Sequence, residues 1–203
     1  ADPAGAFHTA MHLSNLLSVS EHLTVREYAG YVLLQLTQYL TVDQKNEILV
    51  DLTRELETGQ EQISYYIPPF LGRLLCQMPD KELAEGVDYL DDLIHAGSSG
   101  SLRAANAALH TLGAMMTEQC CARAAVFDRV LGLLLTGVAH YEPVIHQTAL
   151  SVLCRGIFGN PNIAQAVRRD CLVRTGKKLL CLLSEPTKDQ LTFYNHAAML
   201  NHL

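Results

Sequence analysis

The apolar residues of this chain recur with the period of an α-helix from one end to the other. Five segments carry apolar or small residues at most of the positions i, i+3, i+4, i+7 and i+8, and they begin at Val25, Ile63, Leu102, Ile145 and Leu191. Asn106, His110 and Asn195 depart from this pattern. In the first of them, the expected stripe is Val25, Tyr28, Ala29, Val32 and Leu33. This spacing places one apolar stripe along a helix. The segments begin 38, 39, 43 and 46 residues apart, which is typical of proteins built from repeated helical pairs.

A second amphipathic stretch precedes each of these segments. The expected first helices span roughly 7–19, 43–57, 81–95, 124–138 and 163–183. Residues that cap or end helices lie between the stretches. Thr41 or Asp43 is expected to cap the second of them, Pro143 to lie in a first helical turn, and Gly159 to end a helix.

Two prolines interrupt the apolar segment Ile63–Leu75. Proline lacks a backbone N–H and disfavours helical angles in the residue before it. We therefore expect a kink or a short break near residues 66–68, with Pro68 able to restart the helix. Both Pro68 and Pro69 are expected to lie off the buried stripe.

The segments VREYAGYVLLQL, SLRAANAALHTLG and VIHQTALSVL resemble the second helix of HEAT repeats, and armadillo repeats are close relatives in architecture. The resemblance implies an all-α fold, a right-handed α-solenoid of about five antiparallel helical pairs. The pairs would cover roughly 5–40, 43–78, 80–117, 121–158 and 161–203 within a single domain over 1–203. Terminal repeats are usually polar on their outer side, but this chain ends at Asn201–Leu203 without a polar capping helix. It is therefore expected to be a fragment of a longer protein or to dock its C-terminus on a partner.

Composition narrows the classes of partner. The net charge is −6 and the fifteen basic residues look dispersed, which argues against nucleic acid as a partner. No apolar run reaches the length needed to span a membrane. Six cysteines without a C-x-x-C pair, most with apolar neighbours, favour reduced thiols and a cytoplasmic protein.

Candidate chemistry is sparse. His8 and His12 lie at i and i+4, a spacing that can hold a metal, but no third ligand is identifiable. The adjacent Cys120 and Cys121 have poor geometry for a disulfide. We therefore expect no catalytic residue, no metal site and no cofactor.

In HEAT-like stacks, the second helices line the inner, concave face, so positions i+1, i+2 and i+6 would face solvent there. Tyrosine, tryptophan and arginine are the residues enriched at binding hot spots. The sequence therefore predicts a non-enzymatic scaffold that binds a peptide or a partner helix in its concave groove. The expected contact residues are Arg26, Tyr31, Tyr65, Arg73, Arg103 and His146.

Two alternatives stay open. One is a HEAT-like enzyme or regulatory subunit with a metal- or thiol-dependent site. The other is a self-association module, a homodimer formed through an apolar end repeat.

Overall fold

The computed structural model describes residues 3–58, 67–96, 101–116, 123–186 and 190–203. The described residues form helices and turns, with no strand among them. The fold class is therefore all-α, as the helical period predicted. The chain divides into two compact units, Ala1–Met115 and Met116–Leu203. The single domain expected over 1–203 stays a prediction.

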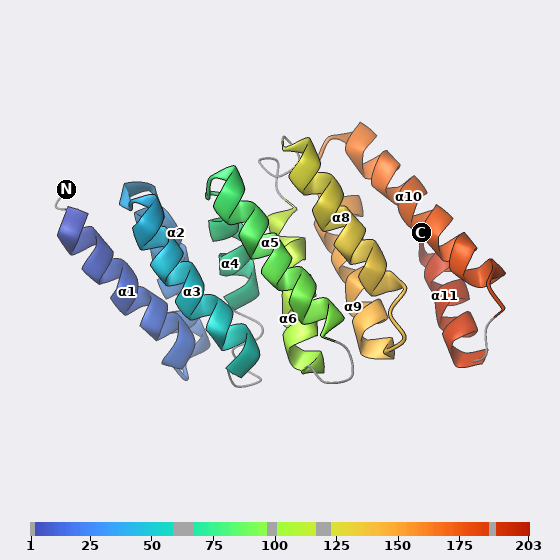
Figure 1. Cartoon of the computed structure of the whole chain (residues 1–203), viewed down its shortest axis with the longest axis horizontal. Helices are drawn as coiled ribbons and strands as arrows, with labels where there is room; N and C mark the ends of the chain where they lie inside the picture. Colours follow the sequence, from blue (N-terminus) through green and yellow to red (C-terminus); the bar gives the residue numbers. More distant parts are fainter. Residues whose placement is uncertain (1–2, 59–66, 97–100, 117–122, 187–189) are drawn as a thin grey trace. The chain divides into compact units, whose positions relative to one another are not determined.

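Three helical pairs build the first unit (Figure 1). Helix α1 packs against α2, α3 against α4 and α5 against α6, and α1, α3 and α5 form one layer while α2, α4 and α6 form the other. The helices are α1 Pro3–Val19, α2 Leu23–Leu36 with the 3-10 turn η1 Thr37–Tyr39, α3 Val42–Thr58, α4 Ile67–Leu75, α5 Asp80–His95 and α6 Leu102–Met115.

The second unit repeats this plan with two pairs. Helix α8 packs against α9, and α10 packs against α11. The helices are α8 Ala124–Val138, α9 Pro143–Leu153 followed by the π-helical turn η4 Cys154–Phe158, α10 Gln165–Ser184 and α11 Gln190–His202. Within each unit, stacked helical pairs bury apolar faces that one pair could not bury alone, which is the packing of an α-solenoid.

Several helix ends follow the expected chemistry. The Gln44 backbone N–H donates to Thr41 Oγ1 at 3.3 Å, and the Thr41 N–H donates to Gln44 Oε1 at 3.0 Å. This reciprocal pair is a capping box at the start of α3. Pro143 lies at the start of α9, and Gly159 follows the last residue of η4.

Helix α4 begins at Ile67, so Pro68 and Pro69 lie in its first turn, where a missing N–H leaves no hydrogen bond unmade. Residues 59–66 lie outside the described part of the chain, and with them Tyr66, the first residue of the expected kink. Pro69 is exposed as expected, but Pro68 is buried, so the prediction that both prolines lie off the buried face was wrong for Pro68.

The expected register of two helices was also wrong. In α2, Val25 and Tyr28 are 38% and 70% exposed, and the buried residues are Arg26, Ala29, Gly30 and Leu33. The buried face of α2 is rotated by one residue. In α11, Leu191 and Tyr194 of the expected stripe are exposed, whereas His196, outside that stripe, is buried. Met199 is buried as expected. Both helices contain enough scattered apolar residues for two adjacent stripes to look alike.

Helices α4 and α6 of the first unit approach each other closely at Gly72. An ideal Cβ atom built on Gly72 would lie 2.6 Å from the Thr111 carbonyl oxygen and 2.7 Å from the Ala114 Cβ. Helix α6 presents small buried residues to its neighbours, among them Ala104, Ala107 and Ala108. Small side chains on α6 and a glycine on α4 allow the two backbones to pack in direct contact.

Replacing Gly72 by alanine is expected to destabilise the protein. The added methyl group would overlap backbone atoms of α6, and such overpacking costs about 1–3 kcal/mol. Gly30→Ala is the matched control, because a Cβ there meets only Leu17 at an ordinary 3.6 Å. That variant should gain about 0.5–1 kcal/mol from helix propensity. Urea unfolding followed by circular dichroism measures both, and equal stability of the two variants would contradict the close approach.

Candidate protein-binding groove

A groove of about 450 Å³ lies between α1, α2 and α4 in the first unit. We call it the α2–α4 groove. Leu17 of α1 contributes to it, with five residues of α2 and three of α4. They are Arg26, Glu27, Gly30, Tyr31 and Leu34 of α2, and Pro69, Phe70 and Arg73 of α4.

Helical spacing explains why these residues share one groove. On α2, Glu27, Tyr31 and Leu34 lie at i, i+4 and i+7, which places them on one side of the helix. On α4, Pro69 and Arg73 lie at i and i+4. They are the only exposed residues of this nine-residue helix, since its other seven residues pack into the core. These sides of α2 and α4 therefore both face the α2–α4 groove.

The groove combines an apolar lining with two arginines. Leu17, Leu34 and Phe70 supply apolar surface, while Arg26 and Arg73 supply positive charge and Glu27 one negative charge. Tyr31 is 63% exposed, and its phenol offers both an apolar ring and a hydrogen-bonding hydroxyl. The apolar lining of such a groove can hold an apolar side chain, and its arginines can pair with a carboxylate beside that side chain.

Three of the six expected contact residues meet in this groove, namely Arg26, Tyr31 and Arg73. Arg26 was expected to face solvent, but it is only 6% exposed, because the rotated register of α2 moves it to the buried edge. Tyr65 lies outside the described residues. Arg103 lies elsewhere on the unit, where its guanidinium donates a 3.0 Å hydrogen bond to the Glu57 carbonyl and links α6 to α3.

His146 belongs to the second unit and is fully buried, so its expected place on a solvent-facing surface was wrong. The physical reason is the width of the buried face of α9. This helix packs against both α8 and α11, so that the adjacent residues Ile145 and His146 are both enclosed, as are Ala149 and Leu150.

A second buried imidazole accompanies His146. The rings of His146 and His196 lie 5.6 Å apart between their centroids, and His196 is 3% exposed. The His146 Nδ1 lies 3.2 Å from the His140 carbonyl oxygen, and the remaining ring nitrogens of the pair have no hydrogen-bond partner. Burial lowers the pKa of His146, and the neighbouring imidazoles of His196 and His140 lower it further, while its bond to the His140 carbonyl opposes these effects.

Because its pKa is lowered, buried His146 should make the stability of the fold depend on pH. An unfolded histidine takes up a proton below about pH 6.5, whereas folded His146 resists protonation, so the free energy of unfolding should decrease as pH falls through this range. We expect His146→Leu to reduce the loss of stability between pH 7.5 and 5.5 by about 1 kcal/mol.

His12→Leu is the control for this experiment, because His12 lies exposed on α1. Urea unfolding of both variants at the two pH values provides the comparison. An identical pH dependence of His146→Leu and His12→Leu would contradict the assignment.

The described residues do not support the remaining candidate chemistry of the sequence, a metal site or a reactive thiol. No group of three or more His, Cys, Asp or Glu in that part of the chain could hold a metal ion, and both His8 and His12 are exposed. Cys76, Cys154, Cys171 and Cys181 are free thiols, and burial raises the pKa of the Cys154 thiol above its usual value. Cys120 and Cys121 lie outside the described residues.

Sequence reasoning missed part of the groove. The solvent-facing positions expected on the second helices included Glu27 and Pro69, and both line it. Gly30, Leu34 and Phe70 were not expected there. Phe70 was assigned to the buried stripe, and it is 3% exposed while still bordering the groove. Gly30 gave no signal of its own, since a Cβ there would meet Leu17 at an ordinary 3.6 Å.

Comparison with known proteins gives structural neighbours only. No protein-family model and no curated protein matches the chain. An engineered protein is 15% identical with a TM-score of 0.39 over 95% of this chain and 78% of its own. A designed armadillo repeat protein in complex with the peptide (KR)4 is 14% identical with a TM-score of 0.40, covering 93% of this chain and 80% of its own.

Another designed armadillo repeat protein is 13% identical with a TM-score of 0.36, covering 93% of this chain and 79% of its own. The HEAT- or armadillo-like expectation is confirmed at the level of fold class. That conclusion rests on the helical pairs of the chain itself.

Proposed function

We propose that this chain is a non-enzymatic interaction module that binds a segment of a partner protein in the α2–α4 groove. The observation that supports this proposal is the meeting of Arg26, Tyr31 and Arg73 around one groove with an apolar lining. Tyrosine and arginine are enriched at the energetic centres of protein interfaces. The three residues come from α2 and α4, and all of them line the same groove.

The charge of the groove favours an acidic segment. Residues 1–115 contain only six Lys and Arg against fifteen Asp and Glu, yet two of those six, Arg26 and Arg73, line this groove. Arg26 is largely buried, so its interaction with a carboxylate would be screened less than that of a surface residue. The proposed ligand is a short segment that presents an apolar side chain next to Asp or Glu.

The cysteines support a reducing compartment, because four of the six are free thiols in the described part of the chain. We therefore place the proposed module in the cytoplasm.

Among the described helices, none is both long and apolar enough to cross a bilayer.

A peptide-binding measurement tests the groove. The probes are fluorescein-labelled peptides of about ten residues that alternate Glu with Leu or Lys with Leu. We expect the full chain to bind the Glu peptide with a Kd on the order of 10–100 µM in fluorescence anisotropy. Arg73→Glu and Tyr31→Ala should each weaken this binding about tenfold or more, since they place a like charge or remove an aromatic contact.

Arg155→Glu is the matched control, because it makes the same change of charge at an exposed residue of the second unit. Equal loss of affinity in Arg73→Glu and Arg155→Glu would remove the groove assignment. Tighter binding of the Lys peptide than of the Glu peptide would overturn the proposed acidic ligand.

A further inference from the structure

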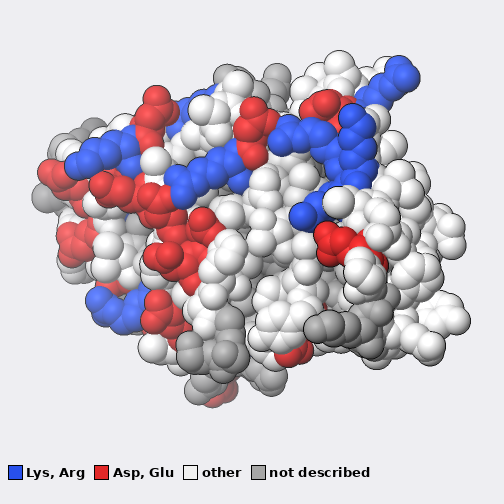
Figure 2. All heavy atoms as spheres, turned by 45° about the vertical axis from the view of Figure 1, so that its right-hand side comes forward, with Lys and Arg blue, Asp and Glu red and all other residues white. Residues whose placement is uncertain are grey.

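The net charge of −6 is the sum of the charges of two units, and these charges have opposite signs. Residues 1–115 carry fifteen Asp and Glu against six Lys and Arg, and residues 116–203 carry six against nine. The first unit therefore has a formal charge of −9 and the second a charge of +3. Figure 2 shows Lys and Arg side chains gathered at the upper right of the face in view. The dispersed basic residues of the linear sequence thus concentrate in the C-terminal unit.

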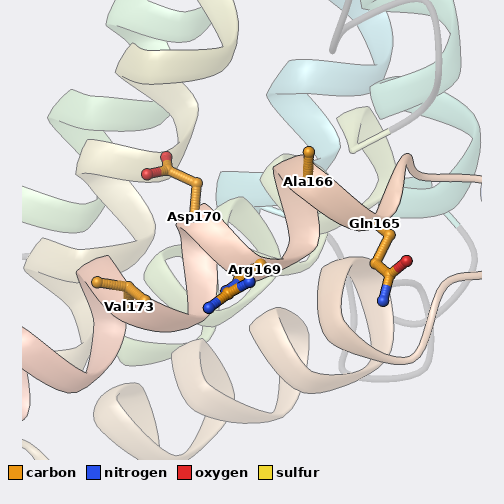
Figure 3. A pocket seen from close by; sticks show the side chains of 5 residues that line it. All are labelled: Gln165, Ala166, Arg169, Asp170 and Val173. Atoms are coloured by element: carbon orange, nitrogen blue, oxygen red, sulfur yellow. The ribbon is translucent and has the colours of Figure 1, made fainter.

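Helix α10 presents a mixed basic and aliphatic surface. Arg169, Val173 and Lys177 lie at i, i+4 and i+8 and are exposed, and we call them the α10 ridge. Val173 is 46% exposed. Arg169 and Val173 also line an open hollow of about 560 Å³ with Gln165, Ala166 and Asp170 (Figure 3).

The first unit carries a surface of opposite charge on α3. Asp43, Glu47 and Val50 lie at i, i+4 and i+7 and are exposed, and we call them the α3 ridge. Val50 is 53% exposed, although isoleucine and leucine on the other side of the helix are fully buried. Each ridge thus consists of one exposed valine and two like charges, and the charges differ in sign between the two ridges.

We propose that the α10 ridge of one chain docks on the α3 ridge of a second copy of this chain. Val173 would bury apolar surface against Val50, and either Arg169 or Lys177, which lie one turn to either side of Val173, would pair with Glu47 one turn from Val50. Opposite potentials on the two ridges steer the copies together and set their orientation. Because the two ridges are different surfaces, the contact is heterologous and leaves one free ridge at each end of a dimer.

The α10 surface suits a protein better than a polyphosphate. Asp170 stands beside the α10 ridge in the same hollow, and Asp128 lies nearby on α8. Both carboxylates contact the guanidinium of Arg174, whose Nη1 lies 2.6 Å from Asp128 Oδ1 and 3.7 Å from Asp170 Oδ2. Arg174 is therefore already neutralised, and a nucleic acid would have to approach two carboxylates. A protein surface carries both cationic and acidic side chains, so it can lie against these two carboxylates.

The chain itself provides a suitable acidic partner surface. The α3 ridge belongs to a unit of charge −9 and is present at the same concentration as the α10 ridge. Both ridges are exposed, so the association should be weak and strongly sensitive to salt.

Sedimentation velocity of the full chain provides the test. In about 20 mM NaCl, where the Debye length exceeds 20 Å, the sedimentation coefficient should rise with protein concentration up to several hundred micromolar. In about 500 mM NaCl, the chain should sediment as a monomer. A chain that stays monomeric at low salt overturns the proposal.

Variants that neutralise one ridge at a time identify the two surfaces in contact. Arg169→Gln with Lys177→Gln removes the basic ridge, and Asp43→Asn with Glu47→Gln removes the acidic ridge. Each double variant alone should be monomeric at low salt. Their equimolar mixture retains one intact ridge of each kind and should form a 1:1 dimer that does not extend further. This result is specific to a heterologous contact.

Controls separate this contact from other effects. Arg155→Gln with Lys81→Gln makes the same change of charge at exposed residues off the two ridges, and it should associate like the wild type. Arg73→Glu in the α2–α4 groove should also leave the association unchanged. Association that persists in the Arg169→Gln/Lys177→Gln variant would overturn the proposal. So would a monomeric chain that instead retards a DNA duplex of about 20 base pairs through the same two residues.

Discussion

The contact of Gly72 with α6 fixes how α4 is rotated, and the groove depends on that rotation. Helix α4 has nine residues and can bring its backbone against the Thr111 carbonyl only along the side that carries no Cβ. With Gly72 turned toward α6, the apolar residues around it fill the core. Pro69 and Arg73 then remain at the edge that faces α2, and both line the groove. A packing constraint inside the unit therefore places the arginine at the proposed binding site.

The helices themselves could be predicted from the sequence because each depends on local signals. Helix α8 spans the expected residues, and the expected capping role of Thr41 is borne out in a reciprocal bond with Gln44. The rotation of α2 could not be predicted in the same way. Its expected and observed stripes share Ala29 and Leu33, and a count of apolar residues treats Arg26 and Gly30 as mismatches. The packing of α2 against α1 and α4 decides between the stripes, and those contacts are tertiary.

Burial of His146 illustrates a second limit of periodicity. A single stripe assumes that a helix has one neighbour, so the residue next to the stripe is assigned to solvent. Helix α9 has neighbours on two sides, α8 and α11, and the enclosed face widens to include His146. The polar residue is then tolerated because an uncharged imidazole is far easier to bury than a charged one. The same burial that removes His146 from the solvent-facing surface lowers its pKa and should therefore make the second unit less stable in acid.

Net charge was the least informative property of the sequence, because the opposite charges of the two units partly offset each other. The distribution matters more, and it separates two kinds of electrostatic contact. Arg26 is enclosed beside apolar groove residues, so salt screens its attraction to a carboxylate only partly. Arg169 and Lys177 are open to solvent, and salt screens them almost completely. Raising the salt concentration should therefore dissociate copies of the chain well before it releases a peptide from the α2–α4 groove. A single salt titration would then distinguish the exposed contact from the buried one.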